Sequence, residues 1–178
     1  MNRALEITAV ICNLLYTVLY LNNSNWCYLF GIIGPLMLAI LCLKNQLYAE
    51  PVLQLVYIGF AIYGWFFAAG DWNIVRWEIS NHLPYIGASI AIALISGLVL
   101  RKFTEAKLPF ADSVVTVFGI TGTWLMVNYV HENWLYFMMI NALSIYIYLR
   151  RKLYVGAAMF LLYFVMAIDG YFELKIFY

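Results

Sequence analysis

The sequence predicts an all-α membrane protein with seven transmembrane helices, arranged as a 3+1+3 parallel repeat of three-helix bundles. Hydrophobic residues make up 66% of the 178 positions, and charged residues make up only 11%. Soluble domains carry charge at about a quarter of their positions. The second observation is an internal repeat, and the third is a strong bias of Lys and Arg to alternate loops. We therefore expect one transmembrane domain over residues 1–178.

Seven apolar runs are long enough to cross a bilayer, which takes about 20 residues per helix. They span residues 5–21, 26–43, 51–69, 83–100, 112–130, 134–149 and 155–174. Pro51, Pro84 and Pro109 stand at or just before helix starts, where a missing N–H group costs little. Pro35 lies inside the second run, so we expect a kink there.

The cationic residues predict the orientation, because cytoplasmic loops keep an excess of Lys and Arg. Eight fall on one side of the seven-helix arrangement: Arg3, Lys44, Arg101, Lys102, Lys107, Arg150, Arg151 and Lys152. Only Arg76 and Lys175 fall on the other side. The N-terminus is therefore expected in the cytoplasm and the C-terminus outside.

The repeat has an offset of 106 residues. KNQLY at 44–48 returns as RRKLY at 150–154, and IYGW at 62–65 returns as IDGY at 168–171. With a slip of two residues, Asn25-Trp26 is matched by Asn133-Trp134. The first three helices thus match the last three in the same orientation, and the helix at 83–100 has no counterpart. The expected parts are a first bundle at 1–70, a linker with the fourth helix at 71–108, and a second bundle at 109–178. Such repeats are common in transporters, which hold substrate between the copies.

Several classes of function lack support in the sequence. It has no nucleotide-binding loop, nucleophile elbow or metalloprotease motif, so we expect neither an enzyme nor a cofactor. A net charge of +1 gives no footprint for nucleic acid. Cys12, Cys27 and Cys42 lack metal-site spacing. His131-Glu132 lacks further ligands, so we expect it in a solvated loop and not at a metal.

Helical spacing puts Trp134, Phe137 and Asn141 on one face of the sixth helix. Two aromatic rings with an amide one turn below can stack on a flat ring and orient it by hydrogen bonds. The alternative is that Trp134 belongs to the interfacial aromatic belt and that Asn141 bonds to a neighbouring helix. Spacing alone favours neither interpretation.

Other candidate binding residues lie in the third and seventh helices. Gln54 shares a face with Tyr57 and, further along, Trp65. Asp169 follows Tyr163 by six residues in the seventh helix. A carboxylate within the membrane is costly, so it predicts a functional site, where it could balance a cationic substrate or relay a proton. The alternative places Asp169 at the hydrated outer surface.

Several short motifs resemble the Pnu family of vitamin transporters. ENWLYF at 132–137, IN at 140–141 and LY at 153–154 are similar to the family's E-N-W-x-x-W-x-x-x-N motif and the L-Y that follows. The remaining matches are FG at 30–31, QLYA at 46–49, LQ at 53–54, IYGW at 62–65 and DS at 112–113. They follow the family's order through most of the chain.

The resemblance implies a multi-pass facilitator of SWEET-like fold in the bacterial inner membrane, assembled as a homotrimer. It implies a small vitamin substrate, nicotinamide riboside, thiamine or riboflavin, trapped inside the cell by a cytoplasmic vitamin kinase. The matched positions imply substrate contacts at Gln54, Trp134 and Asn141, with Trp65 and Trp124 nearby.

Two departures from the family pattern concern the substrate. Phe137 replaces the second Trp, and Gly34-Pro35 stands where nicotinamide riboside transporters tend to have Asn. A lost amide would remove a partner for ribose, which favours thiamine slightly. Both vitamins contain a cationic aromatic ring, suited to an aromatic box near Asp169. A sugar facilitator of the same fold is the alternative. A seven-helix receptor or photoreceptor is disfavoured, because the last helix has only Lys175, at its end, for a Schiff base.

Overall fold

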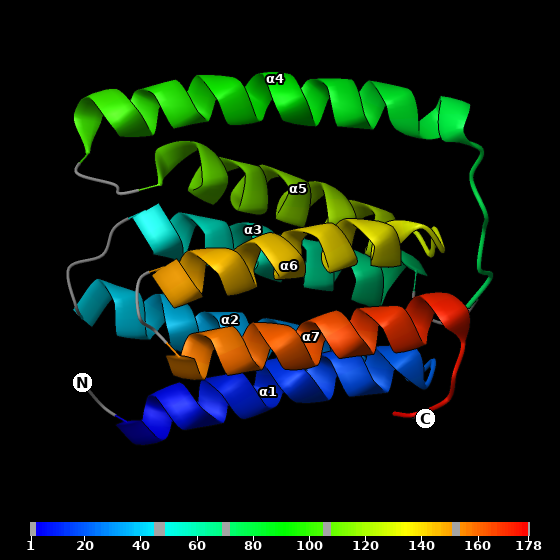
Figure 1. Ribbon diagram of the computed structural model, residues 1–178. Helices are drawn as coiled ribbons and strands as arrows, with labels where there is room; N and C mark the ends of the chain where they lie inside the picture. Colours follow the sequence, from blue (N-terminus) through cyan, green and yellow to red (C-terminus); the bar gives the residue numbers. More distant parts are fainter. Residues whose placement is uncertain (1–2, 45–48, 69–71, 105–107, 151–153, 178) are drawn as a thin grey trace. The chain divides into compact units, whose positions relative to one another are not determined.

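The computed structural model describes residues 3–44, 49–68, 72–104, 108–150 and 154–177. Within those ranges the chain forms seven α-helices and one π-helical turn, η1, with no β-strand beyond an isolated bridge between Val75 and Val130. The elements are α1 Arg3–Leu21, α2 Cys27–Lys44, α3 Ala49–Tyr63, η1 Gly64–Ala68, α4 Ile79–Phe103, α5 Pro109–Val127, α6 Asn133–Arg150 and α7 Tyr154–Phe172 (Figure 1). The seven helices predicted from the apolar runs are confirmed.

The chain divides into two compact units. One contains Met1–Asn73 and Ile176–Tyr178, and the other contains Ile74–Lys175. In the first unit α1 packs on α2 and α2 on α3; in the second, α4 packs on α5, α5 on α6 and α6 on α7. Successive helices within each unit run in opposite directions (Figure 1). Each unit is therefore a series of helical hairpins.

Length and composition allow two helices in the described residues to cross a membrane, α4 and α5. Shorter apolar helical stretches cover Ile7–Leu21, Cys27–Ile40, Leu53–Ala68 and Ala157–Phe172. α6 has 18 residues, as many as such a span needs, but it does not reach the same apolar content. Its polar residues include the buried Asn133, Asn141 and Ser144. The helix that carries three candidate binding residues thus buries several polar side chains.

The contact between α4 and α5 is built from small side chains. Ser89, Ala93 and Gly97 recur at every fourth position of α4 and are buried. Small residues at this spacing allow two helix backbones to approach closely. The hydroxyl groups of Ser89 and Thr121 lie 2.8 Å apart and share a hydrogen bond. A Cβ atom added at Gly97 would lie 2.5 Å from Cδ1 of Phe110, so Gly97 leaves the space that this ring fills.

The turn between α1 and α2 and the turn between α5 and α6 have the same hydrogen bonds, 106 residues apart. The side-chain amide of Asn22 donates to the Val18 carbonyl at 2.8 Å, and the side-chain amide of Asn128 donates to the Trp124 carbonyl at 2.7 Å. The next residues, Asn23 and Tyr129, have positive φ angles of 52° and 56°. The backbone bonds Ser24 N to Leu19 O and Cys27 N to Ser24 O recur as Val130 N to Leu125 O and Asn133 N to Val130 O. The two turns therefore have the same hydrogen-bonding pattern in a single register.

That register corrects the two-residue slip expected from the Asn-Trp dipeptides. The bond from Tyr28 N to Asn25 O, 3.3 Å, corresponds to the bond from Trp134 N to His131 O, 3.4 Å. Trp134 therefore corresponds to Tyr28 and not to Trp26. The turn's backbone hydrogen bonds fix which residues correspond, and a similar dipeptide two residues away does not alter them. The slipped alignment was wrong.

Candidate functional site

Trp134, Phe137 and Asn141 line one side of α6 in the second unit. The rings of Trp134 and Phe137 have centroids 6.3 Å apart and are tilted by 57°. Trp134 and Asn141 are only 6% and 7% exposed, and Phe137 is half-buried. The indole is therefore withdrawn from the surface, unlike Trp26, which is 63% exposed. The burial of Trp134 argues against an anchor in the interfacial aromatic belt and leaves helix packing and substrate contact as its possible roles.

The indole of Trp134 lies on the backbone of α7 at Gly170. A Cβ atom added at Gly170 would lie 2.6 Å from Cδ2 and 2.7 Å from Cζ2 of the ring. Real Cβ atoms essentially never approach so closely, so only glycine leaves room for the indole. The residue before it, Asp169, has no exposed surface. α6 and α7 thus place an aromatic ring next to the segment that carries a buried carboxylate.

Asp169 is buried and not at a hydrated surface, which was the alternative for this residue. Glu173, one turn further on, is exposed and lies 3.4 Å from Arg76 in a surface ion pair. An ionised carboxylate is expensive to bury in an apolar environment. The buried Asp169 therefore does not serve to hydrate the protein surface, as an exposed acid such as Glu173 can.

Trp124 and Tyr163 are half-buried in the same unit. The carbonyl of Trp124 accepts the Asn128 side-chain amide at 2.7 Å, which fixes the end of α5. Tyr163 lies beside Phe160 with ring centroids 6.4 Å apart, and Phe160 packs edge-on to Tyr148 at 4.9 Å. Tyr163 thus belongs to an aromatic row along α6 and α7.

Gln54, Tyr57 and Trp65 belong to the first unit and are half-buried. Gln54 and Tyr57 lie on α3, whereas Trp65 lies in the π-helical turn η1. The Trp65 ring meets Trp26 edge-on, with centroids 6.3 Å apart and an interplanar angle of 75°. π-Helical turns are rare in proteins, and those that do occur often lie at functional sites.

Sequence reasoning missed Tyr28, which packs on a glycine in the first unit as Trp134 does in the second. Tyr28 has no exposed surface, and a Cβ atom added at Gly64 would lie 2.8 Å from its Cδ1 atom. Tyr28 and Gly64 precede Trp134 and Gly170 by the same 106 residues, so each unit packs one ring on one glycine. The repeated glycine was visible in the sequence, but the slipped alignment paired Trp134 with Trp26.

His131-Glu132 does not form the expected solvated loop. His131 is 3% exposed, and its Nε2 atom lies 3.1 Å from the Tyr171 carbonyl oxygen. A carboxylate oxygen of Glu132 accepts the backbone N–H of Trp77 at 2.9 Å. The segment before α4 covers this turn through the bond from His131 N to Val75 O, 2.8 Å. The prediction of a solvated loop was wrong, because the residues next to His131-Glu132 in the sequence gave no sign that the segment before α4 covers them.

Comparison with known proteins agrees with this architecture. The family described as nicotinamide mononucleotide transporter matches residues 3–175. The nicotinamide riboside transporters PnuC of Escherichia coli K12 and Shigella flexneri are each 24% identical over 174 residues, covering 80% of this chain and 73% of theirs.

A crystal structure of the vitamin B3 transporter PnuC shares the fold, with a TM-score of 0.76 and 21% identity over 99% of this chain and 82% of that one. The likeness at this identity concerns the fold. The family match covers almost the whole chain. The chain therefore belongs to the nicotinamide mononucleotide transporter family and is a membrane transport protein, not an enzyme.

Proposed function

We propose that this protein carries nicotinamide riboside across the bacterial inner membrane by facilitated diffusion. The observation that carries the proposal is the Trp134 indole packed on Gly170, next in the chain to the buried Asp169. A pyridinium ring is flat and cationic, so it can stack on an indole and gain from a nearby negative charge. The names of the relatives from Escherichia coli and Shigella flexneri support the same substrate.

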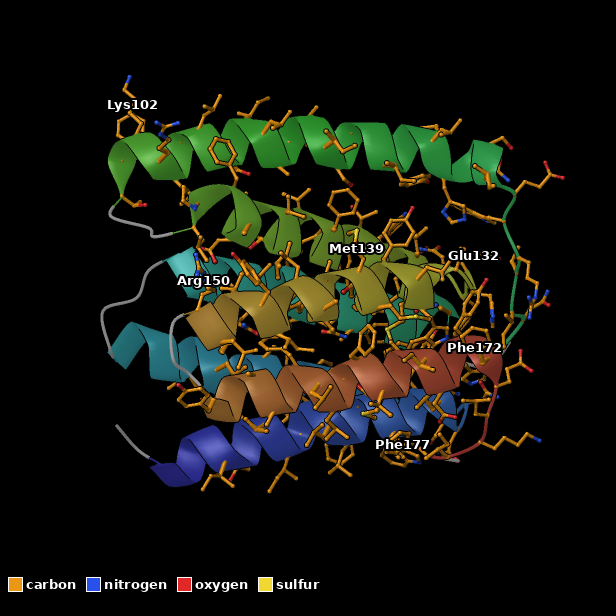
Figure 2. All side chains as sticks on the ribbon, viewed as in Figure 1. Lys102, Glu132, Met139, Arg150, Phe172 and Phe177 are labelled. Carbon is orange, nitrogen blue, oxygen red and sulfur yellow. The ribbon has the colours of Figure 1, made fainter. Side chains whose placement is uncertain are left out.

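The family description names the mononucleotide, whereas the relatives are named for the riboside. A phosphate monoester carries about −1.5 to −2 charges at neutral pH and seeks Arg or Lys. In the second unit, Lys102 and Arg150 lie at one end and Glu132 at the other (Figure 2). The buried charged residue of α7 is an acid, Asp169. This charge distribution favours a cationic riboside over an anionic nucleotide.

Thiamine is the second candidate, because Gly34 replaces an amide that could serve a ribose. A Cβ atom added at Gly34 would lie 2.5 Å from Oδ1 of Asn13 in α1. An amide therefore occupies the space beside position 34, supplied by the neighbouring helix. Asn13 can supply the amide that position 34 lacks, which answers one of the two departures, and the change at Phe137 stays in favour of thiamine.

For mechanism, we propose alternating access in a 3+1+3 arrangement, with bundles at 1–70 and 109–178 and a linker with α4 at 71–108. Transporters with repeats hold substrate where the copies meet, and one copy moves against the other. The duplicated hairpins support this arrangement. The proposed contacts are Gln54, Tyr57, Trp65, Trp124, Trp134, Phe137, Asn141, Tyr163 and Asp169. The protein would act as a homotrimer with the N-terminus in the cytoplasm and the C-terminus outside, and a cytoplasmic kinase would trap the vitamin.

The test is uptake of labelled nicotinamide riboside, nicotinamide mononucleotide and thiamine into proteoliposomes without ATP or an ion gradient. We expect the riboside to equilibrate faster than the other two. Trp134→Ala and Asn141→Ala should each reduce its uptake at least tenfold. Phe103→Ala and Asn81→Ala, at exposed positions of α4, are the matched controls. Equilibration of thiamine alone would replace the substrate, and equilibration of none would refute the facilitator.

Asp169→Asn separates two roles of the buried acid. If Asp169 balances the charge of the substrate, the amide variant loses riboside affinity at every pH. If it relays a proton, only a pH-dependent part of uptake is lost. We expect the first result, because facilitated diffusion of a fixed cation needs no proton.

A further inference from the structure

A half-open cavity of about 680 Å³ lies in the second unit, and none of the proposed substrate contacts is among its lining residues. Its walls include Trp77, His82, Phe118, Glu132, Tyr136 and Tyr171. Cavities of roughly 300–1,000 Å³ hold drug-sized ligands. The transport mechanism proposed above uses none of these six side chains.

The cavity and the proposed substrate contacts use different faces of α6. Leu135, Tyr136 and Met139 of α6 follow one another at helical spacing and line the cavity, together with Glu132 in the turn just before the helix. Trp134, Phe137 and Asn141 follow the same spacing from another starting point. Residues three and four apart share a helix face, so the two sets point in different directions.

A polar cluster lies within the apolar walls. Nδ1 of His82 lies 3.0 Å from the Tyr136 hydroxyl, and Nε2 lies 3.9 Å from the Glu132 carboxylate, beyond hydrogen-bond distance. His82 is 7% exposed, and its Nε2 atom is buried without a hydrogen-bond partner among the described residues. Buried polar atoms are nearly always paired. Nε2 is closed off from the cavity, so the polar group that a bound molecule can reach is the Glu132 carboxylate, whose side chain is 16% exposed.

The charge of the cavity indicates which molecule. The described lining includes no Lys or Arg, and the basic group beside the Glu132 carboxylate is the His82 imidazole, 3.9 Å away, which carries charge only when protonated. Aromatic rings of Trp77, Tyr136, Tyr171 and Phe118 form much of the remaining wall. A carboxylate among aromatic faces attracts a cation with an apolar body through charge and cation–π interactions.

We propose that this cavity is a second ligand site, which binds an organic cation with an aromatic or apolar body. Glu132 balances the charge, and the aromatic walls hold the body of the ligand. The site is independent of Trp134 and Asp169, so it stands whether or not the chain carries nicotinamide riboside.

The test is calorimetric titration of the purified full-length protein in lipid nanodiscs with 1-methylnicotinamide, a small aromatic cation, and with nicotinamide, its neutral counterpart. Glu132→Gln keeps an oxygen that can accept the Trp77 N–H but removes the charge. We expect a site that prefers the cation at least tenfold, loses that preference in Glu132→Gln, and persists in Trp134→Ala. Binding of 1-methylnicotinamide that persists in Trp134→Ala separates this site from the transport site. Loss of the transport site would instead appear as reduced uptake of nicotinamide riboside.

A second pair of variants keeps the test independent of Glu132. Leu135→Trp places a bulky ring at the cavity wall, at a position that is 42% exposed and tolerant of size. Leu98→Trp, 57% exposed on α4 and outside the cavity, is its matched control. We expect only Leu135→Trp to abolish binding of 1-methylnicotinamide.

Three results would overturn the proposal. Equal binding of nicotinamide and 1-methylnicotinamide would show that charge plays no part. Binding in detergent that disappears in nanodiscs would assign the cavity to lipid. Disulfide cross-linking of Leu135→Cys chains into oligomers, with no cation binding to the wild type, would assign it to a second copy of this chain.

Discussion

Trp134 packs its indole ring on Gly170, and a Cβ atom added there would lie 2.6 Å from ring atom Cδ2. The contact joins α6 to α7 at the residue that follows the buried Asp169. Tyr28 lies against Gly64 in the first unit in the same way. A ring held on a helix backbone has little freedom to move, which would favour the stacking of a flat ligand proposed above.

Gly170→Ala should therefore displace the Trp134 indole. Overpacking of a filled core costs about 1–3 kcal/mol, and we expect a lower melting temperature with at least a tenfold loss of riboside affinity. Gly87→Ala is the matched control, because nothing lies within 4 Å of a Cβ atom at Gly87 in α4. The measurements are thermal unfolding in detergent and uptake into proteoliposomes. Equal behaviour of the two alanine variants would contradict the packing role of Gly170.

The turn between α1 and α2 depends on the backbone conformation of Asn23. Its φ angle of 52° lies in the left-handed region, which Asn and Gly tolerate better than other residues. We expect Asn23→Ala to lower the free energy of unfolding by about 1 kcal/mol, and Asn23→Gly to change it little. Asn81→Ala, in the ordinary helical backbone of α4, is the control. A loss in Asn23→Gly as large as in Asn23→Ala would assign the effect to the side chain.

The sequence was sufficient to predict the seven helices, because long apolar runs and polar breaks are local properties. It also placed Trp134, Phe137 and Asn141 on one helix face through their spacing. The pairing of Trp134 with Gly170 and the cluster of His82 with Glu132 depend on contacts between distant segments, so spacing could not reveal them. The slip at Asn25-Trp26 arose because similar dipeptides can be aligned in more than one register. The backbone hydrogen bonds of the two turns agree with only one of these registers.

The orientation predicted from Lys and Arg can be tested with single cysteines. Lys102 lies at one end of the second unit, and Phe172, next to Glu173, lies at the other (Figure 2). In a chain with Cys12, Cys27 and Cys42 replaced by Ala, we expect Glu173→Cys to react with an impermeant maleimide on intact cells. Lys102→Cys should react only after the membrane is opened. Loss of the exposed Arg76–Glu173 ion pair should cost under about 1 kcal/mol. The reverse labelling pattern would invert the topology.

The register of the repeat predicts that Tyr28, and not Trp26, is the counterpart of Trp134. Tyr28 has no exposed surface and stacks near Trp72, with ring centroids 6.4 Å apart, whereas Trp26 is 63% exposed. Removal of a buried aromatic ring costs about 3–5 kcal/mol, so Tyr28→Ala should lower the melting temperature much as Trp134→Ala does. Trp26→Ala should have a small effect, since it removes mainly the edge contact with Trp65. Thermal unfolding of the three variants in one detergent compares them directly. A larger loss of stability in Trp26→Ala than in Tyr28→Ala would contradict the packing role of the buried Tyr28 ring.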